Sequence, residues 1–183
     1  MLDAVSGVFP SGAVRRRIVR VATLYLVLVS LTLGLPGAAR AALAPGESHR
    51  EMELDGVTRH YRVWVPAGYD GSVPVPLVLD FHGFTSNDVQ QALISGFRQV
   101  ADVEGFIVIH PLGVGSSWNA GDLCCGQALQ QGIDDVGFAR AIVDATAAEA
   151  NIDRRRVYAT GLSNGGAMSH RIAGQLWPRR SPR

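Results

Sequence analysis

Two runs of alternating polar and apolar residues, 51–55 and 57–65, flank the dipeptide Asp55-Gly56. Asp-Gly between two alternating runs is a strong signal for a tight β-hairpin. Because side chains alternate across a strand, one face of the second run is apolar and the other carries Arg62 and Trp64. The apolar face consists of Tyr61, Val63 and Val65. The pattern predicts a hairpin with one buried face.

Beyond the hairpin, strand patterns alternate with helical patterns. Residues 77–81 and 106–110 are short continuous apolar runs, as expected of strands buried on both faces, and residues 155–160 form a third strand. Helices are expected over residues 89–104 with an apolar stripe of Ala92, Ile94, Phe97, Val100 and Val103, over residues 134–150, and after Ser163 with Met168, Ile172 and Leu176. This order predicts an α/β fold, with a mostly parallel sheet and helices on both faces.

The N-terminal part of the chain has the pattern of an export signal. Four arginines, at positions 15, 16, 17 and 20, precede an uncharged apolar run over residues 21–35, and Ala39-Arg40-Ala41 fits a cleavage site. This predicts a signal peptide over residues 1–41 and an exported domain over residues 42–183, without stable membrane association after cleavage. The alternative is a signal anchor that stays in the membrane, although the run is shorter than the span of about 20 residues that a helix needs.

Charge and cysteine content narrow the partners of the chain. The formal net charge is +1, which gives no reason to expect a nucleic-acid partner. The two cysteines are the adjacent pair Cys124 and Cys125. An oxidising compartment favours disulfides, but neighbouring cysteines rarely bridge each other without strain. A partner elsewhere in a longer chain is therefore the preferred interpretation.

The segment Gly161-Leu162-Ser163-Asn164-Gly165 lies between the third predicted strand and its helix. This is the context of a nucleophile elbow, in which a strained turn lifts the serine hydroxyl clear of the sheet. A Cβ at Gly161 or Gly165 is expected to collide with the neighbouring strand and helix. The backbone N–H of Asn164 can then face a developing oxyanion. The alternative is a glycine-rich turn that contains a serine by chance.

A second oxyanion donor is expected where the strand over residues 77–81 ends in His82-Gly83-Phe84. A loop N–H at this point can aim at the same position as the N–H of Asn164. We therefore assign the N–H of Phe84 as the second donor. His82 is expected to hold the loop rather than to act in catalysis.

The acid and base that a serine nucleophile needs are missing from the sequence. No Asp or Glu follows Ser163, and the histidine that follows it, His170, is expected on the same helix about 10 Å away. Asp134 and Asp135 are explained as caps of the helix over residues 134–150. The tail, residues 177–183, has no periodicity. These features favour a C-terminally truncated chain, in which the strand before Ser163 becomes an exposed sheet edge.

Several motifs together resemble the secreted polyhydroxybutyrate depolymerase-like esterases, a family that includes feruloyl and acetylxylan esterases. The motifs are Arg62-Val63-Trp64-Val65-Pro66, Leu79-Asp80-Phe81-His82-Gly83-Phe84, Trp118-Asn119, Asp134-Asp135-Val136-Gly137-Phe138 and Gly161-Leu162-Ser163-Asn164-Gly165-Gly166. The resemblance implies an α/β-hydrolase fold, here without its C-terminal strands. It also implies a Ser-Asp-His triad, no cofactor or metal, and ester substrates that are attached to polymers or form them.

The resemblance also implies roles for individual residues. Ser163 matches the nucleophile, and Phe84 and Asn164 match the oxyanion positions. Trp118 would line the substrate pocket, with anchoring of its loop as the equally weighted alternative. Relatives often carry a cysteine on the helix after the elbow, but Gly174 takes roughly that place here, so the pairing of Cys124 and Cys125 stays open.

The combined expectation is the N-terminal portion of a secreted serine esterase that forms an acyl-enzyme on Ser163. Its substrates would be polyhydroxybutyrate-type oligomers or feruloyl and acetyl esters of polysaccharides. The chain as given is expected to be inactive because the triad Asp and His are absent. Two alternatives remain: a non-catalytic exported binding protein on an esterase scaffold that uses the Trp118 loop, and an anchored membrane protein. The oligomeric state is not predicted.

Overall fold

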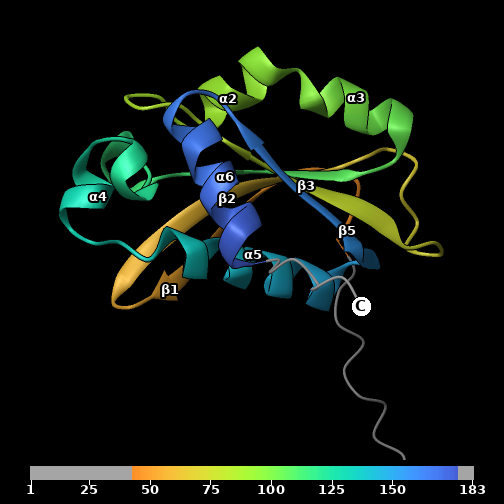
Figure 1. Ribbon diagram of the computed structural model, residues 1–183. Helices are drawn as coiled ribbons and strands as arrows, with labels where there is room; N and C mark the ends of the chain where they lie inside the picture. Colours follow the sequence, from red (N-terminus) through yellow and green to blue (C-terminus); the bar gives the residue numbers. More distant parts are fainter. Residues whose placement is uncertain (1–42, 177–183) are drawn as a thin grey trace, which may run out of the picture. The chain divides into compact units, whose positions relative to one another are not determined.

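A computed structural model describes residues 43–176 of the chain (Figure 1). The chain divides into two units, Met1–Ala39 and Arg40–Arg183, and the described residues belong to the second. The predicted signal peptide over residues 1–41 and the tail over residues 177–183 lie outside the described residues. Within residues 43–176, no helix has both the length and the apolar character needed to cross a membrane.

The described residues form a five-stranded sheet in the order β1-β2-β4-β3-β5, with helices packed against it. β1 and β2 are antiparallel, β2 is antiparallel to β4, and β4, β3 and β5 run parallel to one another. In chain order the elements are β1 (Gly46–Leu54), β2 (Val57–Val65), β3 (Val75–Phe81), α2 (Asp88–Ser95), α3 (Phe97–Glu104), β4 (Ile107–Pro111), η1 (Val114–Ser116), η2 (Gly121–Leu123), α4 (Gln127–Gln130), α5 (Asp135–Glu149), β5 (Ile152–Gly161) and α6 (Asn164–Gln175).

The predicted hairpin is confirmed. Leu54 pairs with Val57 across the turn, where Asp55 (φ 51°) and Gly56 (φ 76°) both adopt positive φ. Positive φ at both central residues is the geometry that a two-residue hairpin requires. The expected apolar face is also correct, since its three residues are 7% exposed or less: Tyr61, Val63 and Val65.

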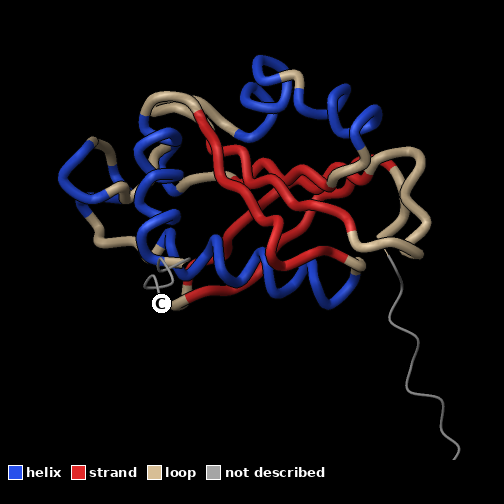
Figure 2. The backbone as a smooth tube through the Cα atoms, turned by 45° about the vertical axis from the view of Figure 1, so that its right-hand side comes forward, coloured by secondary structure: helices blue, strands red, loops and turns tan. Residues whose placement is uncertain are grey.

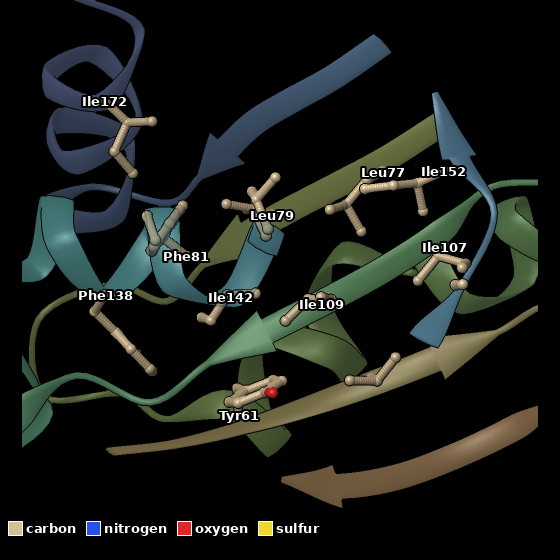
Figure 3. Close-up of a cluster of buried hydrophobic side chains, with 14 of the residues drawn as sticks. Tyr61, Leu77, Leu79, Phe81, Ile107, Ile109, Phe138, Ile142, Ile152 and Ile172 are labelled. Carbon is tan, nitrogen blue, oxygen red and sulfur yellow. The ribbon is translucent and has the colours of Figure 1, made fainter. Parts of the chain in front are cut away.

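Helices cover both faces of the sheet, as the sequence predicts. α5 and α6 lie on one face, and α2 and α3 lie on the other (Figures 1 and 2). The core between the sheet and the α5–α6 layer is apolar (Figure 3). α5 and α6 contribute Phe138, Ile142 and Ile172 to this core, and β2 and β5 contribute Tyr61, Val63, Val65 and Ile152. β3 and β4 contribute Leu77, Leu79, Phe81, Ile107 and Ile109. Burial on both faces explains why these strands are continuous apolar runs.

The single helix predicted over residues 89–104 is wrong, because the segment forms two helices. Gly96 adopts left-handed geometry (φ 64°), which ends α2 and starts α3. A change of backbone direction breaks the 3.6-residue repeat, so an apolar stripe counted across Gly96 no longer faces one side. Ala92 is buried as expected, but Ile94 is 61% exposed and Val103 is 81% exposed.

β5 is at the edge of the sheet formed by residues 43–176. It covers Ile152–Gly161, three residues more at its start than the sequence predicts. Its Tyr158 side chain is 53% exposed. The structure of these residues therefore has the exposed edge that the sequence predicts.

Candidate active site

Ser163 occupies a strained turn between β5 and α6. Its φ of 52° and ψ of −114° lie in a region that L-residues other than glycine rarely adopt. The turn is held by two hydrogen bonds, from Leu162 N–H to the Phe81 carbonyl (3.1 Å) and from Gly165 N–H to the Leu162 carbonyl (2.8 Å). Ser163 is exposed, at the end of a strand and the start of a helix. The local geometry is that of the predicted elbow.

The two outer glycines of the elbow have no room for a side chain. A Cβ at Gly161 would lie 2.5 Å from the Phe81 carbonyl oxygen and 2.7 Å from the carbonyl carbon of Gly165. A Cβ at Gly165 would lie 2.6 Å from the His82 carbonyl oxygen and closer still to that of Phe81. These obstacles are backbone atoms of the strand and helix, as the sequence predicts.

The loop after β3 lies beside the proposed nucleophile. A Cβ built on Gly83 would be 3.8 Å from the Cβ of Ser163. Thr85 N–H, the next donor along the loop after Phe84, is already bound to the Ser116 carbonyl at 2.9 Å. By contrast, the N–H groups of Phe84 and Asn164 have no acceptor among residues 43–176. Two free donors near one exposed hydroxyl are what an oxyanion hole requires.

His82 is buried and uses both ring nitrogens inside the protein. Its Nε2 accepts a hydrogen bond from Gly113 N–H at 2.9 Å, and its Nδ1 lies 2.8 Å from the Gly83 carbonyl, to which it donates. Burial lowers the pKa of His82, and the bond to the Gly83 carbonyl opposes this shift. A neutral ring with no free nitrogen holds the loop rather than abstracting a proton.

Replacing His82 with glutamine is expected to flatten the pH dependence of stability. Because the pKa of His82 is lowered on folding, the unfolded chain binds its proton first, and stability falls as the pH drops below about 6.5. A single such group contributes a slope of at most about 1.4 kcal/mol per pH unit. Urea denaturation of both proteins between pH 5 and pH 7 measures the difference. His60→Gln, at an exposed strand position, should leave the slope unchanged; an equal effect there would contradict the prediction.

Trp118 lies under the elbow rather than at its mouth. Its side chain is fully buried, with the indole N–H donating to the His82 carbonyl at 2.8 Å and the ring edge-to-face with Phe81 at 5.0 Å. Its backbone N–H donates to the Asn164 Oδ1 at 2.7 Å, and Asn164 Nδ2 donates back to the Trp118 carbonyl at 3.2 Å. A fully buried ring offers no surface to a substrate, so this geometry favours the anchoring alternative.

Asp135 has a different role from the capping that the sequence suggests. Asp134 is the cap of α5, since its Oδ1 accepts from Gly137 N–H at 2.8 Å. Asp135 is buried instead, where one oxygen accepts from Arg59 Nη2 at 2.6 Å and the other from Asn119 N–H at 2.7 Å. Burial raises the pKa of Asp135, and the Arg59 guanidinium opposes the shift.

Asn119 links this ion pair to the helix after the elbow. Its carbonyl and its Oδ1 accept from the Arg171 guanidinium of α6 at 2.5 and 2.8 Å. The Trp118-Asn119 and Asp134-Asp135 motifs are therefore in contact, although 16 residues separate Asn119 from Asp135. Both motifs belong to the family resemblance, but the contact between them is visible only in the structure.

Cys124 and Cys125 are joined to each other by a disulfide. This differs from the expectation that each has a partner elsewhere. They lie in the loop between η2 and α4, and the next residue, Gly126, is packed close to Ser117 and the Phe84 ring.

No described histidine is placed to act as the base for Ser163. His82 has both nitrogens engaged, and His170 is exposed on the same helix, as the sequence predicts. A buried pair does join His110 Nδ1 to Asp80 Oδ2 at 3.2 Å. It faces α2, since Asp80 also accepts from Gln91, and α2 covers the opposite face of the sheet from α6. Residues 43–176 thus bring together an exposed serine on a strained turn and two N–H groups without acceptors, but they place no acid–base pair beside that serine.

Comparison with known proteins agrees with this geometry. No protein-family model matches the chain. NocK of Nocardia uniformis subsp. tsuyamanensis, which is provisionally classed as an esterase, is 35% identical over 69% of this chain and 37% of its own length. Feruloyl esterase B of Piromyces equi is 33% identical over 61% of this chain and 20% of its own. The bifunctional acetylxylan esterase/xylanase XynS20E of Neocallimastix patriciarum is 31% identical over 66% of this chain and 16% of its own length.

Solved structures of esterases superpose on this chain and support the same fold. A thermostable esterase superposes with a TM-score of 0.54 at 25% identity, covering 72% of this chain and 38% of that one. The acetyl xylan esterase from Aspergillus awamori superposes with a TM-score of 0.58 at 20% identity. The match covers 70% of this chain and 47% of that one. The chain has the α/β-hydrolase fold, and its homologues are carboxylic ester hydrolases. This α/β-hydrolase chain matches less than half of the length of each of these relatives.

Proposed function

We propose that this chain carries the nucleophile and oxyanion half of a serine esterase that cleaves carboxylic esters. Ser163 would attack the ester carbonyl and form an acyl-enzyme, while the N–H groups of Phe84 and Asn164 stabilise the tetrahedral oxyanion. The observation that carries the proposal is the positive φ of Ser163, an exposed serine between a strand and a helix. Strain of this kind is kept where it serves a function.

The substrate class follows from the relatives. The names of two relatives, feruloyl esterase and acetylxylan esterase, say that they cleave feruloyl and acetyl esters. An oxyanion hole can bind the carbonyl oxygen of either ester. We therefore propose feruloyl or acetyl esters of polysaccharides, or polyhydroxybutyrate-type oligomers. Trp118 is proposed to anchor the oxyanion loop in this site, since its indole N–H holds the His82 carbonyl.

Export is part of the same proposal. The arginines and apolar run before Ala39-Arg40-Ala41 support removal of residues 1–41 and release of the domain over residues 42–183 outside the cytoplasm. N-terminal sequencing of the protein secreted by an expressing host should give a first residue near Ala42. A retained N-terminus in the membrane fraction would support the anchored alternative.

The nucleophile can be tested without full turnover. Prolonged incubation with diethyl p-nitrophenyl phosphate should phosphorylate Ser163, detected as a mass increase of the peptide that contains it. Ser163→Ala should remove the label, while Ser72→Ala, at an exposed loop serine, should keep it. Labelling spread equally over surface serines would contradict the proposal. Retention on insoluble polymer without labelling would instead support a non-catalytic binding protein.

A further inference from the structure

The disulfide between Cys124 and Cys125 has no part in the reaction proposed above. Both residues are partly exposed, in the loop between η2 and α4. A disulfide stabilises a fold mainly by closing a loop of the unfolded chain, and the effect grows with the length of that loop. A bond between neighbours encloses almost no chain, so it adds little to the stability of the whole domain. Its constraint acts instead on the backbone at these two residues.

The residue after the disulfide carries this constraint to the loop after β3. Gly126 has a φ of 97° and a ψ of −179°, a conformation that is essentially confined to glycine. A Cβ at Gly126 would lie 2.8 Å from Cε2 of the Phe84 ring and 2.7 Å from Oγ of Ser117. The backbone that follows Cys125 is therefore packed directly against the residue of the proposed second oxyanion donor.

Hydrogen bonds hold the surrounding segments together. The backbone N–H of Ala128 in α4 donates to Oγ of Ser117 at 3.0 Å. The carbonyl of the preceding residue, Ser116, accepts from the N–H of Thr85 at 2.9 Å. The segment with Ser116 and Ser117 is therefore bonded both to α4 and to the loop that carries Phe84.

The same segment reaches the elbow. Trp118, which follows Ser117, donates its backbone N–H to Oδ1 of Asn164 at 2.7 Å. Its indole N–H donates to the carbonyl of His82 at 2.8 Å. Both residues of the proposed oxyanion hole, Phe84 and Asn164, thus contact one packed unit that begins at the disulfide.

A partly exposed disulfide that does not staple the fold is open to thiol–disulfide exchange. A thiolate of a dithiol reductant attacks one sulfur, and the S–S bond breaks as a mixed disulfide forms. The second thiol of the reductant then closes its own ring and releases the remaining cysteine sulfur. The two cysteines gain two electrons and two protons in total, and the dithiol loses the same number.

We propose that Cys124 and Cys125 form a reversible redox site that controls the oxyanion loop, with a dithiol as its reducing partner. In the oxidised form, the bond fixes the backbone that holds Gly126 against Phe84. In the reduced form, the two sulfurs separate, the backbone between them regains its freedom, and Phe84 loses this fixed support. Reduction therefore lowers the reactivity of Ser163. That last effect rests on the proposed esterase function, whereas the redox site itself does not.

Reduction of the ¹⁵N-labelled protein with dithiothreitol, followed by NMR, tests the redox site. The amide signals of Phe84, Ser117 and Gly126 should shift, while the spectrum as a whole stays that of a folded protein. Iodoacetamide added to a reduced sample should modify both Cys124 and Cys125, as read by mass spectrometry. Replacing dithiothreitol with oxidised glutathione should restore the original signals. The matched control is oxidised dithiothreitol, which has no free thiol and should change nothing.

The double variant Cys124→Ser/Cys125→Ser separates the effect on Ser163 from that of the reductant. Diethyl p-nitrophenyl phosphate should label its Ser163 on the order of fivefold more slowly than that of the parent. Outright removal of an oxyanion donor costs roughly 10²- to 10³-fold. Asp122→Asn, exposed in the same loop, keeps the disulfide and should label at the rate of the parent. If the double variant does not fold, the parent, reduced and then freed of reductant under nitrogen, gives the same comparison.

Three results would overturn the redox site: a disulfide that resists reduction in the folded protein, reduction that leaves the Phe84 signal unchanged, or reduction that unfolds the domain. Unfolding would show that the bond is a general staple. Equal labelling rates in the parent and the double variant would overturn its control of the oxyanion loop. If Ser163 is labelled in neither protein, the esterase proposal fails, and the amide shifts still decide the redox site.

Discussion

A polypeptide of these 183 residues is expected to hydrolyse p-nitrophenyl acetate on the order of 10⁴- to 10⁶-fold more slowly than an esterase with a complete triad. The reason is that none of the described residues, 43–176, is placed as a base to take the proton of Ser163. His82 is neutral and fully hydrogen-bonded, His110 is buried against the other helix layer, and His170 is exposed further along α6. No Asp or Glu follows Ser163 that could orient a base.

Release of p-nitrophenol by purified protein, compared with buffer and with Ser163→Ala, measures this prediction. The Ser163→Ala variant should match the parent chain to within a few-fold, because the parent's hydroxyl has no base to activate it and the variant has no hydroxyl at this position. Turnover in the range of 1–10³ s⁻¹ typical of enzymes, abolished in Ser163→Ala and kept in Ser72→Ala, would show that an acid–base pair does reach the serine.

Replacing Gly165 with alanine is expected to lower the free energy of unfolding by about 3 kcal/mol. The added Cβ would lie 2.6 Å from the His82 carbonyl oxygen and against the Phe81 carbonyl. Both obstacles are backbone atoms at the end of β3, so relief requires the strand and α6 to separate. Chemical denaturation of the two proteins gives the difference directly.

The matched control for this substitution is Gly174→Ala on the same helix. A Cβ at Gly174 meets no atom within 4 Å. Alanine there should raise the free energy of unfolding, by up to about 1 kcal/mol, because it removes backbone freedom of the unfolded chain. If both substitutions raised the free energy of unfolding, helix propensity rather than the close approach of the elbow would govern Gly165.

The parts of the site that are predicted correctly are those with a local sequence signal. The elbow needs glycine two residues on each side of Ser163, and the structure has backbone atoms where their side chains would be. The loop after β3 is placed by the strand that precedes it, so Gly83 reaches Ser163 as the motif implies. The roles of Ser163, Phe84 and Asn164 remain predictions for the labelling and turnover experiments.

The misjudged parts depend on partners that are distant in the sequence. Asp135 reads as a capping residue because it starts a helix, but its main partner, Arg59, is 76 residues away. From the sequence, Trp118 fits a pocket residue and a loop anchor equally well. In the structure, its hydrogen bonds to His82 and Asn164 place it under the elbow. The apolar pattern in the sequence continues through Gly96, so it does not indicate the break between the two helices there.

The sequence by itself determined the order of the strands, the hairpin, the elbow turn and the fold class. The hairpin and the elbow turn follow from turn chemistry and glycine sterics within a few consecutive residues, and the fold class follows from the order of strand and helix patterns along the chain. Only the tertiary structure decided which charged residues are buried together, that Trp118 is fully buried, and that a cavity opens beside the hairpin turn. Those features arise where separate segments pack, and burial then sets the cost of every unpaired polar group.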